Sequence, residues 1–232
     1  MNHSIWAIVP AAGVGRRMQS NIPKQYMILN GRPVLEHTIN VLLQSEYIKG
    51  LVIALQHDDA YWSDINIASQ KPVIRADGGD ERADSVLNAL TELMNYEQFS
   101  ENDWVMVHDA VRPCLRQNDI SKLAIEVVDK NGGLLALPVR DTMKRQNETN
   151  TVEQTIDREK LWHALTPQYF PAIALKQALV EAKDNEQLVT DESSAMEAAG
   201  FSPKLVHGQE DNIKITRQDD LRLASLYLQS NS

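Results

Sequence analysis

The sequence predicts an α/β fold, a Rossmann-like and mostly parallel sheet with helices on both faces. Short apolar runs rich in β-branched residues alternate with longer amphipathic stretches, as in repeated strand and helix units. Glycines and polar residues follow several of these runs, where an open α/β sheet places its ligand-binding loops. The 232 residues are expected to form one domain, 1–232, with a buried core and an open cleft.

Strands are expected where short apolar runs are bounded by Gly, Pro or polar residues. These runs are Ile5–Val9, Leu51–Leu55, Val73–Arg75, Trp104–Val107 and Leu134–Val139.

Helices are expected where apolar residues recur at intervals of three or four. These stretches are Pro33–Ser45, Arg82–Met94, Ser121–Val128 and Arg217–Leu228. In the last stretch Leu221, Ala224 and Leu228 should face the core. Thr216 and Asp219 form a pattern typical of a helix N-terminus.

The segment Met143–Arg158 interrupts this alternation, because it is polar on both sides. Residues 147–150 are turn formers, and residues such as Val152 and Ile156 favour strand structure. Two interpretations stay open at this point. The segment is either a mobile surface loop or a β-hairpin arm that protrudes to reach a partner subunit.

Charge and cysteine content argue against several classes of protein. The chain has 32 acidic residues against 23 Lys and Arg, a net charge of −9, which should repel nucleic acid and anionic membranes. The apolar run Ile5–Ala12 is too short to cross a bilayer, and no basic region precedes it as in a signal peptide. The single cysteine, Cys114, precludes an internal disulfide. We therefore expect a cytoplasmic protein without nucleic-acid or membrane partners.

The first candidate site is the loop PAAGVGRRM, residues 10–18, directly after the first expected strand. Gly13 and Gly15 would let backbone N–H groups approach a ligand and form an anion cradle. Arg17 and Lys24 add positive charge to it. The loop therefore indicates a small anionic ligand.

Known phosphate-binding motifs do not match this loop. Met18 stands where the dinucleotide fingerprint requires its third glycine, and the G-K-[ST] of a P-loop is absent. Neither a nicotinamide dehydrogenase nor a P-loop ATPase is favoured. Residues 1–35 nevertheless contain no Asp or Glu, so the positive charge of this region is local and unopposed.

The run VHDAVRP, residues 107–113, places an acid after another strand. Asp109 would either help to hold a magnesium ion together with phosphates or cap the following turn. Arg112 would hold a phosphate or carboxylate, or form a structural ion pair. His108 is not interpreted as part of a catalytic triad, because no serine occupies a nucleophile elbow.

A third candidate site is GGDERADS, residues 78–85. Gly79 and the helix start would bring backbone amides against a flat base, with Asp80 or Ser85 on its polar edge. The alternative is a glycine turn in which Asp80 caps the helix.

Further polar clusters lie late in the chain, around Thr166, Thr190 and Lys214. Thr190 alone is more typical of a helix cap than of a ligand contact. Lys214 lies between two isoleucines, in a strand-like run. It is either an edge-strand residue facing water or a residue that points into an anionic site.

These segments together resemble the 2-C-methyl-D-erythritol 4-phosphate cytidylyltransferase family, over nearly the whole chain. The resemblance implies a nucleotidyltransferase domain that transfers the cytidylyl group of CTP to 2-C-methyl-D-erythritol 4-phosphate, with release of pyrophosphate, in the non-mevalonate isoprenoid pathway. The first loop alone indicates only nucleotidyltransferases that activate sugar phosphates. The narrower match rests on PAAGVGRRM, PKQY, GGDERADSV, VHDAVRP, PVRDTMKR, LWHALTPQYF, TDESSAMEAAG and DNIKITRQDDL.

The resemblance also implies a role for each matching residue. The catalytic residues would be Arg17, Lys24 and Lys214. CTP would be bound by Ala11, Ala12, Gly13, Gly15, Gly79, Asp80 and Ser85. The second substrate would be bound by Asp109, Arg112, Thr142, Arg158, Thr166 and Thr190.

A metal and a partner subunit are implied in the same way. The metal would be Mg²⁺, or another divalent cation in its place, with Asp109 as a protein ligand. The chain would form a homodimer in which the arm, residues 142–165, carries Thr142 and Arg158 to the site of the other subunit.

Two rival functions remain possible from the sequence. A cytidylyltransferase for another polyol phosphate, such as ribitol 5-phosphate, would differ only in its second-substrate pocket. A non-catalytic nucleotide-binding regulator would share the fold. The joint presence of Arg17, Lys24, Asp109 and Lys214 argues against the regulator, because a sensor needs affinity but not every cation of a transition state.

Overall fold

The computed structural model describes residues 3–13 and 22–230. Within these residues, a seven-stranded sheet has the order β11-β7-β10-β6-β1-β4-β5, which confirms the α/β prediction. Only β10 is antiparallel to its neighbours, β6 and β7. The strands are β1 (Ile5–Pro10), β4 (Ile48–Leu55), β5 (Val73–Asp77), β6 (Trp104–Val107), β7 (Gly133–Pro138), β10 (Trp162–Pro171) and β11 (Lys204–His207).

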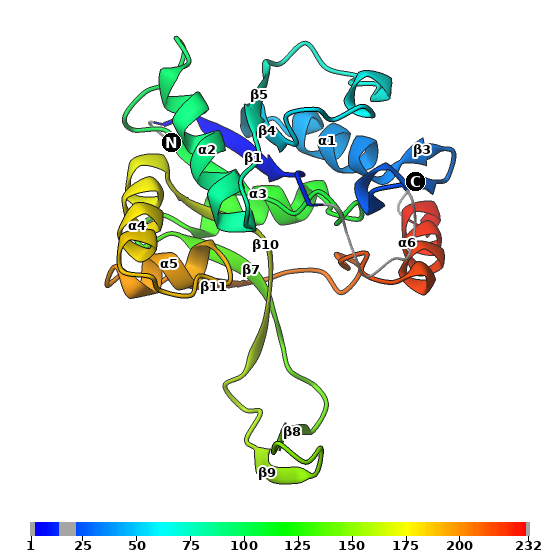
Figure 1. Cartoon of the computed structure of the whole chain (residues 1–232), viewed down its shortest axis with the longest axis vertical. Helices are drawn as coiled ribbons and strands as arrows, with labels where there is room; N and C mark the ends of the chain where they lie inside the picture. Colours follow the sequence, from blue (N-terminus) through cyan, green and yellow to red (C-terminus); the bar gives the residue numbers. More distant parts are fainter. Residues whose placement is uncertain (1–2, 14–21, 231–232) are drawn as a thin grey trace.

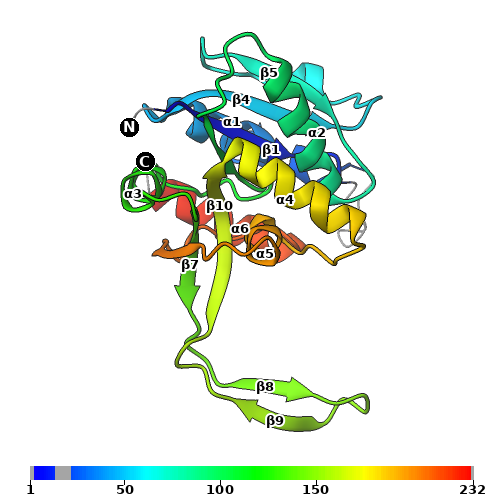
Figure 2. The same ribbon diagram turned by 90° about the vertical axis from the view of Figure 1, so that its left-hand side faces the viewer.

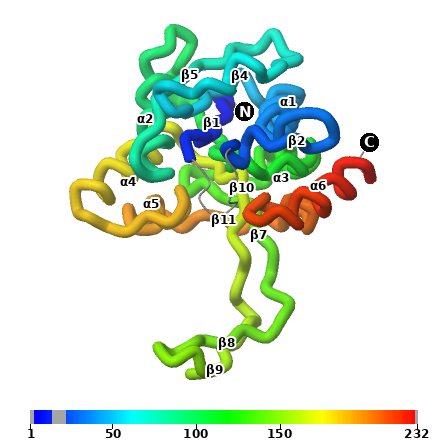
Figure 3. Tube along the Cα trace, turned by 45° about the vertical axis from the view of Figure 1, so that its right-hand side comes forward, coloured from blue at the N-terminus to red at the C-terminus, as the bar shows by residue number. Residues whose placement is uncertain are grey.

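Helices cover both faces of this sheet (Figures 1 and 2). The apolar side chains of α1 and α3 pack on one face, and those of α2, α4 and α5 pack on the other. The last helix, α6, lies against β2 at the other end of the molecule from α4 (Figure 3). The helices are α1 (Val34–Gln44), α2 (Arg82–Asn95), α3 (Gln117–Glu126), α4 (Ala172–Asp184), α5 (Glu192–Ala198) and α6 (Gln218–Ser230).

The central strand β1 is buried on both faces, which explains its uninterrupted apolar sequence. Ile5 and Val9 point into the cluster under α1 and α3, whereas Trp6 and Ile8 point into the cluster under α2 and α4. From β1 the chain crosses to β4 and β5 on one side and later returns to β6 on the other side. The loops that follow β1 and β6 therefore diverge at a topological switch point, where open α/β sheets bind ligands.

Several expectations for single elements were wrong. The third helix begins at Gln117 rather than Ser121, and its buried face includes Asp119 and Ile120, which precede the expected start. Lys214 lies in a loop and not in a strand. Thr216 does precede a helix, but both its N–H and its hydroxyl donate to Asp220, at 2.7 and 2.9 Å, and not to Asp219. The inward placement of Leu221, Ala224 and Leu228 on α6 is confirmed.

The polar segment forms a β-hairpin, the secondary structure expected of an arm. Strands β8 (Met143–Gln146) and β9 (Val152–Ile156) pair antiparallel and project away from the body of the molecule (Figure 1). At the tip, Asn147 Oδ1 accepts hydrogen bonds from the N–H groups of Thr149 and Thr151, both at 3.0 Å. The hairpin connects β7 to β10, which are neighbours in the central sheet, so its base is anchored there.

Three smaller elements lie outside the central sheet and its helices. A two-residue ladder joins β2 (Ile28–Leu29) to β3 (Arg32–Pro33), and 3₁₀ turns cover Lys24–Tyr26 and Trp62–Asp64.

Among residues 3–13 and 22–230, no helix has the length and hydropathy needed to span a membrane.

The turn before β7 generates a stability prediction. Gly132 has φ +73°, and a Cβ there would overlap the buried ring of Phe170, whereas Gly200 has φ +88° with no atom within 4 Å of such a Cβ. Both alanine variants strain the backbone, but only Gly132→Ala also overpacks the core. We expect Gly132→Ala to lower the free energy of unfolding by about 2 kcal/mol more than Gly200→Ala. Urea titration of both variants measures this, and equal losses would contradict it.

Candidate active site

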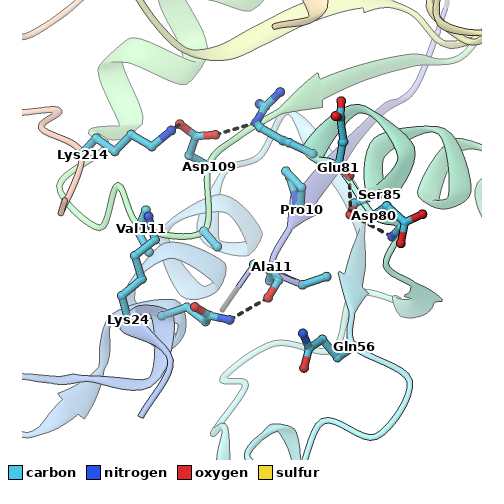
Figure 4. Close-up of a pocket in the computed structure, with 16 residues that line it drawn as sticks. Pro10, Ala11, Lys24, Gln56, Asp80, Glu81, Ser85, Asp109, Val111 and Lys214 are labelled. Atoms are coloured by element: carbon cyan, nitrogen blue, oxygen red, sulfur yellow. Dashed lines mark hydrogen bonds and ion pairs between the residues drawn. The ribbon is translucent and has the colours of Figure 1, made fainter. Parts of the chain in front are cut away.

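A cavity of about 390 Å³ opens at the carboxyl edge of the sheet, at the switch point between β1 and β6 (Figure 4). Its lining comes from the loop after β1, the turn at Lys24, the start of α2 and the loop after β6, together with Gln56 and Lys214. The predicted residues that line it are Ala11, Ala12, Gly13, Lys24, Gly79, Asp80, Ser85, Asp109 and Lys214. Gly15 and Arg17 lie outside the residues that the structure describes.

Close backbone packing shapes the wall formed by residues 78–85. A Cβ at Gly78 would overlap the Cβ of Ala12, and one at Gly79 would overlap the Cβ of Asp84. Glycine at 78 lets the loop after β5 approach the loop after β1, and glycine at 79 lets that loop pack closely against the first turn of α2.

The hydroxyl of Ser85 holds this wall in shape. It accepts a hydrogen bond from the Gly79 N–H at 3.1 Å and donates to the Glu81 carbonyl at 3.2 Å. The helix cap is Glu81, whose N–H donates to Asp84 Oδ2 at 3.1 Å, so the alternative with Asp80 as the cap was wrong. Asp80 is exposed at the rim of the cavity.

The turn that carries Lys24 is fixed by its two neighbours. Gln25 is buried and donates from Nε2 to the Ala11 carbonyl at 2.7 Å. The ring of Tyr26 stacks on Tyr61 with centroids 5.0 Å apart. Lys24 is thus tied to the loop after β1 on one side and to the segment after β4 on the other.

Asp109 lies at the centre of a group of five charged residues, which we call the Asp109 cluster. Its Oδ1 accepts a hydrogen bond from Arg82 Nε at 3.0 Å. Its Oδ2 accepts one from Arg112 Nε at 3.3 Å and lies 2.9 Å from Lys214 Nζ. The fifth member is Glu192, which accepts two hydrogen bonds from the terminal nitrogens of Arg82 at 2.6 and 3.1 Å.

The cluster has an excess of positive charge. Three cations, Arg82, Arg112 and Lys214, face only two carboxylates, those of Asp109 and Glu192. Burial by itself raises the pKa of Asp109, but Arg82, Lys214 and Arg112 outweigh it and hold that pKa well below its usual range. The carboxylate therefore stays ionised at neutral pH, and the excess charge favours binding of an anion.

A second cavity of about 190 Å³ adjoins the first. The two cavities share Arg82, Asp109 and Lys214 in their linings. The smaller cavity also brings together Arg112, Thr166 and Thr190, three residues expected to bind the second substrate. Thr166 lies where the pairing of β10 with β7 shifts register, an irregularity that redirects side chains near binding sites.

His108 supports this region without any means of proton transfer. It is fully buried, and its Nε2 donates to the Arg112 carbonyl at 3.0 Å, which leaves Nδ1 to accept from the Thr166 hydroxyl at 2.9 Å. Thr166 Oγ1 in turn accepts from the Asp109 N–H at 3.1 Å. Burial lowers the pKa of His108 to about 4, so the ring is neutral at pH 7.

A family model described as 2-C-methyl-D-erythritol 4-phosphate cytidylyltransferase matches residues 5–230. The chain belongs to this family. A protein of that name from Aliivibrio fischeri (strain MJ11) is 53% identical over 227 residues, 97% of this chain and 94% of the relative.

Solved structures agree with this membership. A crystal structure of 4-diphosphocytidyl-2C-methyl-D-erythritol synthase is similar with a TM-score of 0.85 at 31% identity, covering 98% of this chain and 100% of that one. The Francisella tularensis 2-C-methyl-D-erythritol 4-phosphate cytidylyltransferase gives 0.82 at 32% identity, covering 97% and 99%.

Two residues expected at the site of this cytidylyltransferase lie elsewhere in the chain. Thr142 and Arg158 are exposed at the base of the hairpin and line neither cavity. Within one chain, therefore, the structure brings the body residues together and leaves the arm residues apart.

Sequence reasoning also missed several residues. Arg82 and Glu192 belong to quoted motifs but received no role. Asn212 is buried: its carbonyl accepts from Arg112 at 2.7 Å and its Nδ2 donates to the Thr166 carbonyl at 2.7 Å. Gln168 is buried and donates to Asp191 Oδ2 at 2.8 Å. The sequence motifs that contain these residues indicated that they matter, but did not indicate which residues they contact.

The described residues suit a metal ion that binds together with substrate phosphates better than one that protein side chains hold alone. In residues 3–13 and 22–230, no group of three or more His, Cys, Asp or Glu side chains is arranged to hold a metal ion. Asp109 is the buried carboxylate of the cavity lining, and each of its oxygens already faces a cation. Mg²⁺ commonly binds through one or two carboxylates plus substrate phosphates, and this donor set suits that mode.

The buried state of His108 generates a pH prediction. Its pKa is about 4 when folded and 6.5 when unfolded, so its contribution to stability is complete above pH 6.5. As pH falls from 6.5 to 4 the unfolded chain takes up the proton first, and stability is lost by up to about 1.4 kcal/mol per pH unit. We expect the free energy of unfolding of His108→Gln, measured by urea titration, to fall less than that of wild type between pH 6.5 and 4. Parallel pH profiles for the two proteins would contradict the assignment.

Proposed function

We propose that this chain transfers the cytidylyl group of CTP to 2-C-methyl-D-erythritol 4-phosphate, in the non-mevalonate pathway to isoprenoid precursors. The products would be 4-diphosphocytidyl-2-C-methyl-D-erythritol and pyrophosphate. Two adjoining cavities that share Arg82, Asp109 and Lys214 support this proposal most directly. A reaction between two phosphorylated substrates needs such an arrangement, and family membership supplies their identity.

The chemistry requires no general base. An oxygen of the second substrate's phosphate attacks the α-phosphorus of CTP, and the bond to the bridging oxygen breaks as pyrophosphate leaves. A phosphate monoester has a second pKa of about 6 and is already an anionic nucleophile at pH 7. The neutral, fully bonded His108 is consistent with this route. The main difficulty is to bring two anions together, which positioned cations reduce.

The first cavity would hold CTP. Backbone groups of Ala11, Ala12 and Gly13 would face the phosphates, and Gly79, Asp80 and Ser85 would recognise cytosine. Because the Ser85 hydroxyl is engaged by Gly79 and Glu81, its main contribution would be to fix the backbone that meets the base.

Cations from two sides would stabilise the transferring phosphate. Lys24 would approach from the turn after the first loop and Lys214 from the Asp109 cluster. By their match to the family motif, Arg17 and Gly15 would also contact the phosphates. The second substrate would occupy the smaller cavity against Arg112, Thr166 and Thr190. The excess positive charge of the cluster would suit its phosphate.

Mg²⁺, or another divalent cation, would enter bound to the triphosphate, with Asp109 as the protein carboxylate next to it. Its chemical contribution would be to neutralise charge on the phosphates. The lining cations would carry the rest of that neutralisation.

We further propose a single nucleotidyltransferase domain that works as a homodimer. The arm, residues 142–165, projects from the body, so Thr142 and Arg158 would reach the second-substrate cavity of the partner subunit. The one cysteine, Cys114, is buried and unpaired, which suits a reducing cytoplasm. The net charge of −9 supports small-molecule rather than nucleic-acid partners.

Pyrophosphate release tests the function. We expect release when the purified chain is given CTP, Mg²⁺ and 2-C-methyl-D-erythritol 4-phosphate, and none with ribitol 5-phosphate in its place. Release with ribitol 5-phosphate alone would overturn the second substrate but keep the CTP site. CTP binding without release from either substrate would instead support the regulator.

Mixed dimers test the composite site. Lys24→Ala removes a contact made mainly in the transition state, so its homodimer should lose about 10²–10³ in kcat. The Arg158→Ala homodimer should lose the contact of the arm with the second substrate. A mixed dimer restores one intact site, because Lys24 and Arg158 of that site come from different subunits. Random exchange should recover about a quarter of wild-type activity. Absence of recovery, with exchange verified by mass, would contradict arm exchange.

A further inference from the structure

Glu192 is a buried carboxylate that lines neither cavity. It is the first residue of α5, is 1% exposed, and is linked to the reacting region only through others. Its two oxygens accept from both terminal nitrogens of Arg82, and Arg82 Nε donates to Asp109 Oδ1. The other oxygen of Asp109 faces Lys214. A continuous chain of contacts therefore runs from Glu192 to Lys214.

The geometry points to Glu192 as a positioning residue that holds Lys214 between the two cavities by way of Arg82 and Asp109. This inference rests on the proposed function in taking Lys214 as a catalytic group. It assigns Glu192 no contact with either substrate.

Stability alone does not account for this buried pair. Well-packed apolar side chains in place of a buried ion pair often stabilise a protein equally well or better. The Arg82–Glu192 pair instead determines which cation contacts which oxygen of Asp109. Because Glu192 engages both terminal nitrogens of Arg82, only Nε is directed at Asp109, and it takes only Oδ1.

Because Arg82 contacts only Oδ1, the Oδ2 atom of Asp109 stays available to Lys214. Asp109 Oδ2 is 2.9 Å from Lys214 Nζ and 3.3 Å from Arg112 Nε. A guanidinium prefers to engage both oxygens of a carboxylate in two parallel hydrogen bonds. Without the charge of Glu192, Arg82 would turn its freed nitrogens to Asp109, compete for Oδ2 and displace the ammonium of Lys214.

A double-mutant cycle tests the positioning role. Glu192→Gln keeps the size of the side chain and removes its charge. We expect it to lower kcat about tenfold while the KM for CTP changes less than about threefold. In a Lys214→Ala background it should cause no further loss beyond about twofold. If the two losses multiply, Glu192 does not act through Lys214 and the inference is wrong.

The same helix offers a matched control. Glu197 is exposed on α5 and its Oε1 accepts from the Ser193 hydroxyl at 2.6 Å, an interaction that glutamine can also make. Glu197→Gln makes the identical change of charge away from Arg82 and should leave kcat unchanged. An equal loss in Glu197→Gln would show a general effect of the charge on α5 and would overturn the inference.

A measurement without substrates separates this inference from the proposed function. An amine-acylating ester should label Lys214 several-fold faster in Glu192→Gln than in wild type or Glu197→Gln, as read by peptide mass spectrometry. Equal labelling would overturn the inference even if the enzyme is active. Should Glu192→Gln fail to fold, Glu192→Asp withdraws the carboxylate from Arg82 and takes its place in both experiments. Failure of wild type to release pyrophosphate would count only against the proposed function.

Discussion

The arrangement of the site depends on one buried carboxylate, that of Asp109, which faces three cations from three separate parts of the chain. Arg82 comes from the start of α2, Arg112 from the loop after β6 and Lys214 from the loop before α6. Like charges brought this close repel each other strongly in a weakly screened interior. Asp109 and Glu192 offset most of that repulsion and leave a single excess positive charge. The same ion pairs that hold three elements together therefore also prepare the site for an anion.

The fold brings these elements together through the divergence of the chain at β1. The loops after β1 and β6 leave neighbouring parallel strands at one edge of the sheet, and the glycine at 78 lets a third loop pack against the loop after β1. Residues of these loops then line one cavity together with Lys24 and Lys214. The strand order of a doubly wound sheet is what places these loops at the same edge.

The sequence predicts the inner strands well because strands buried on both faces are apolar throughout, as in Ile5–Val9 and Trp104–Val107. It predicts β10 poorly, since Pro167 in its middle argues against a strand and is accommodated at an irregularity in the pairing with β7. Among site residues, those in glycine-rich or charged motifs were predicted. The Arg82–Glu192 pair joins residues 110 positions apart, and no local pattern reveals such a contact. Lys214 was expected in a strand-like run because Ile213 and Ile215 flank it. Ile215 is indeed buried, but it packs in a cluster with Ala224 of α6 rather than in the sheet.

Strand β10 runs from Trp162, at the base of the arm, to Pro171, which pairs with β6, and Thr166 and Gln168 line the smaller cavity on the way. The pairing of β10 with β7 fixes the register of this strand, so adding or removing one residue between Trp162 and Thr166 would move Thr166 out of its place in the cavity lining. The hairpin tip between β8 and β9 carries no such restriction. Insertions and deletions during evolution should therefore accumulate at the tip of the arm, while the number of residues between its base and the cavity stays constant.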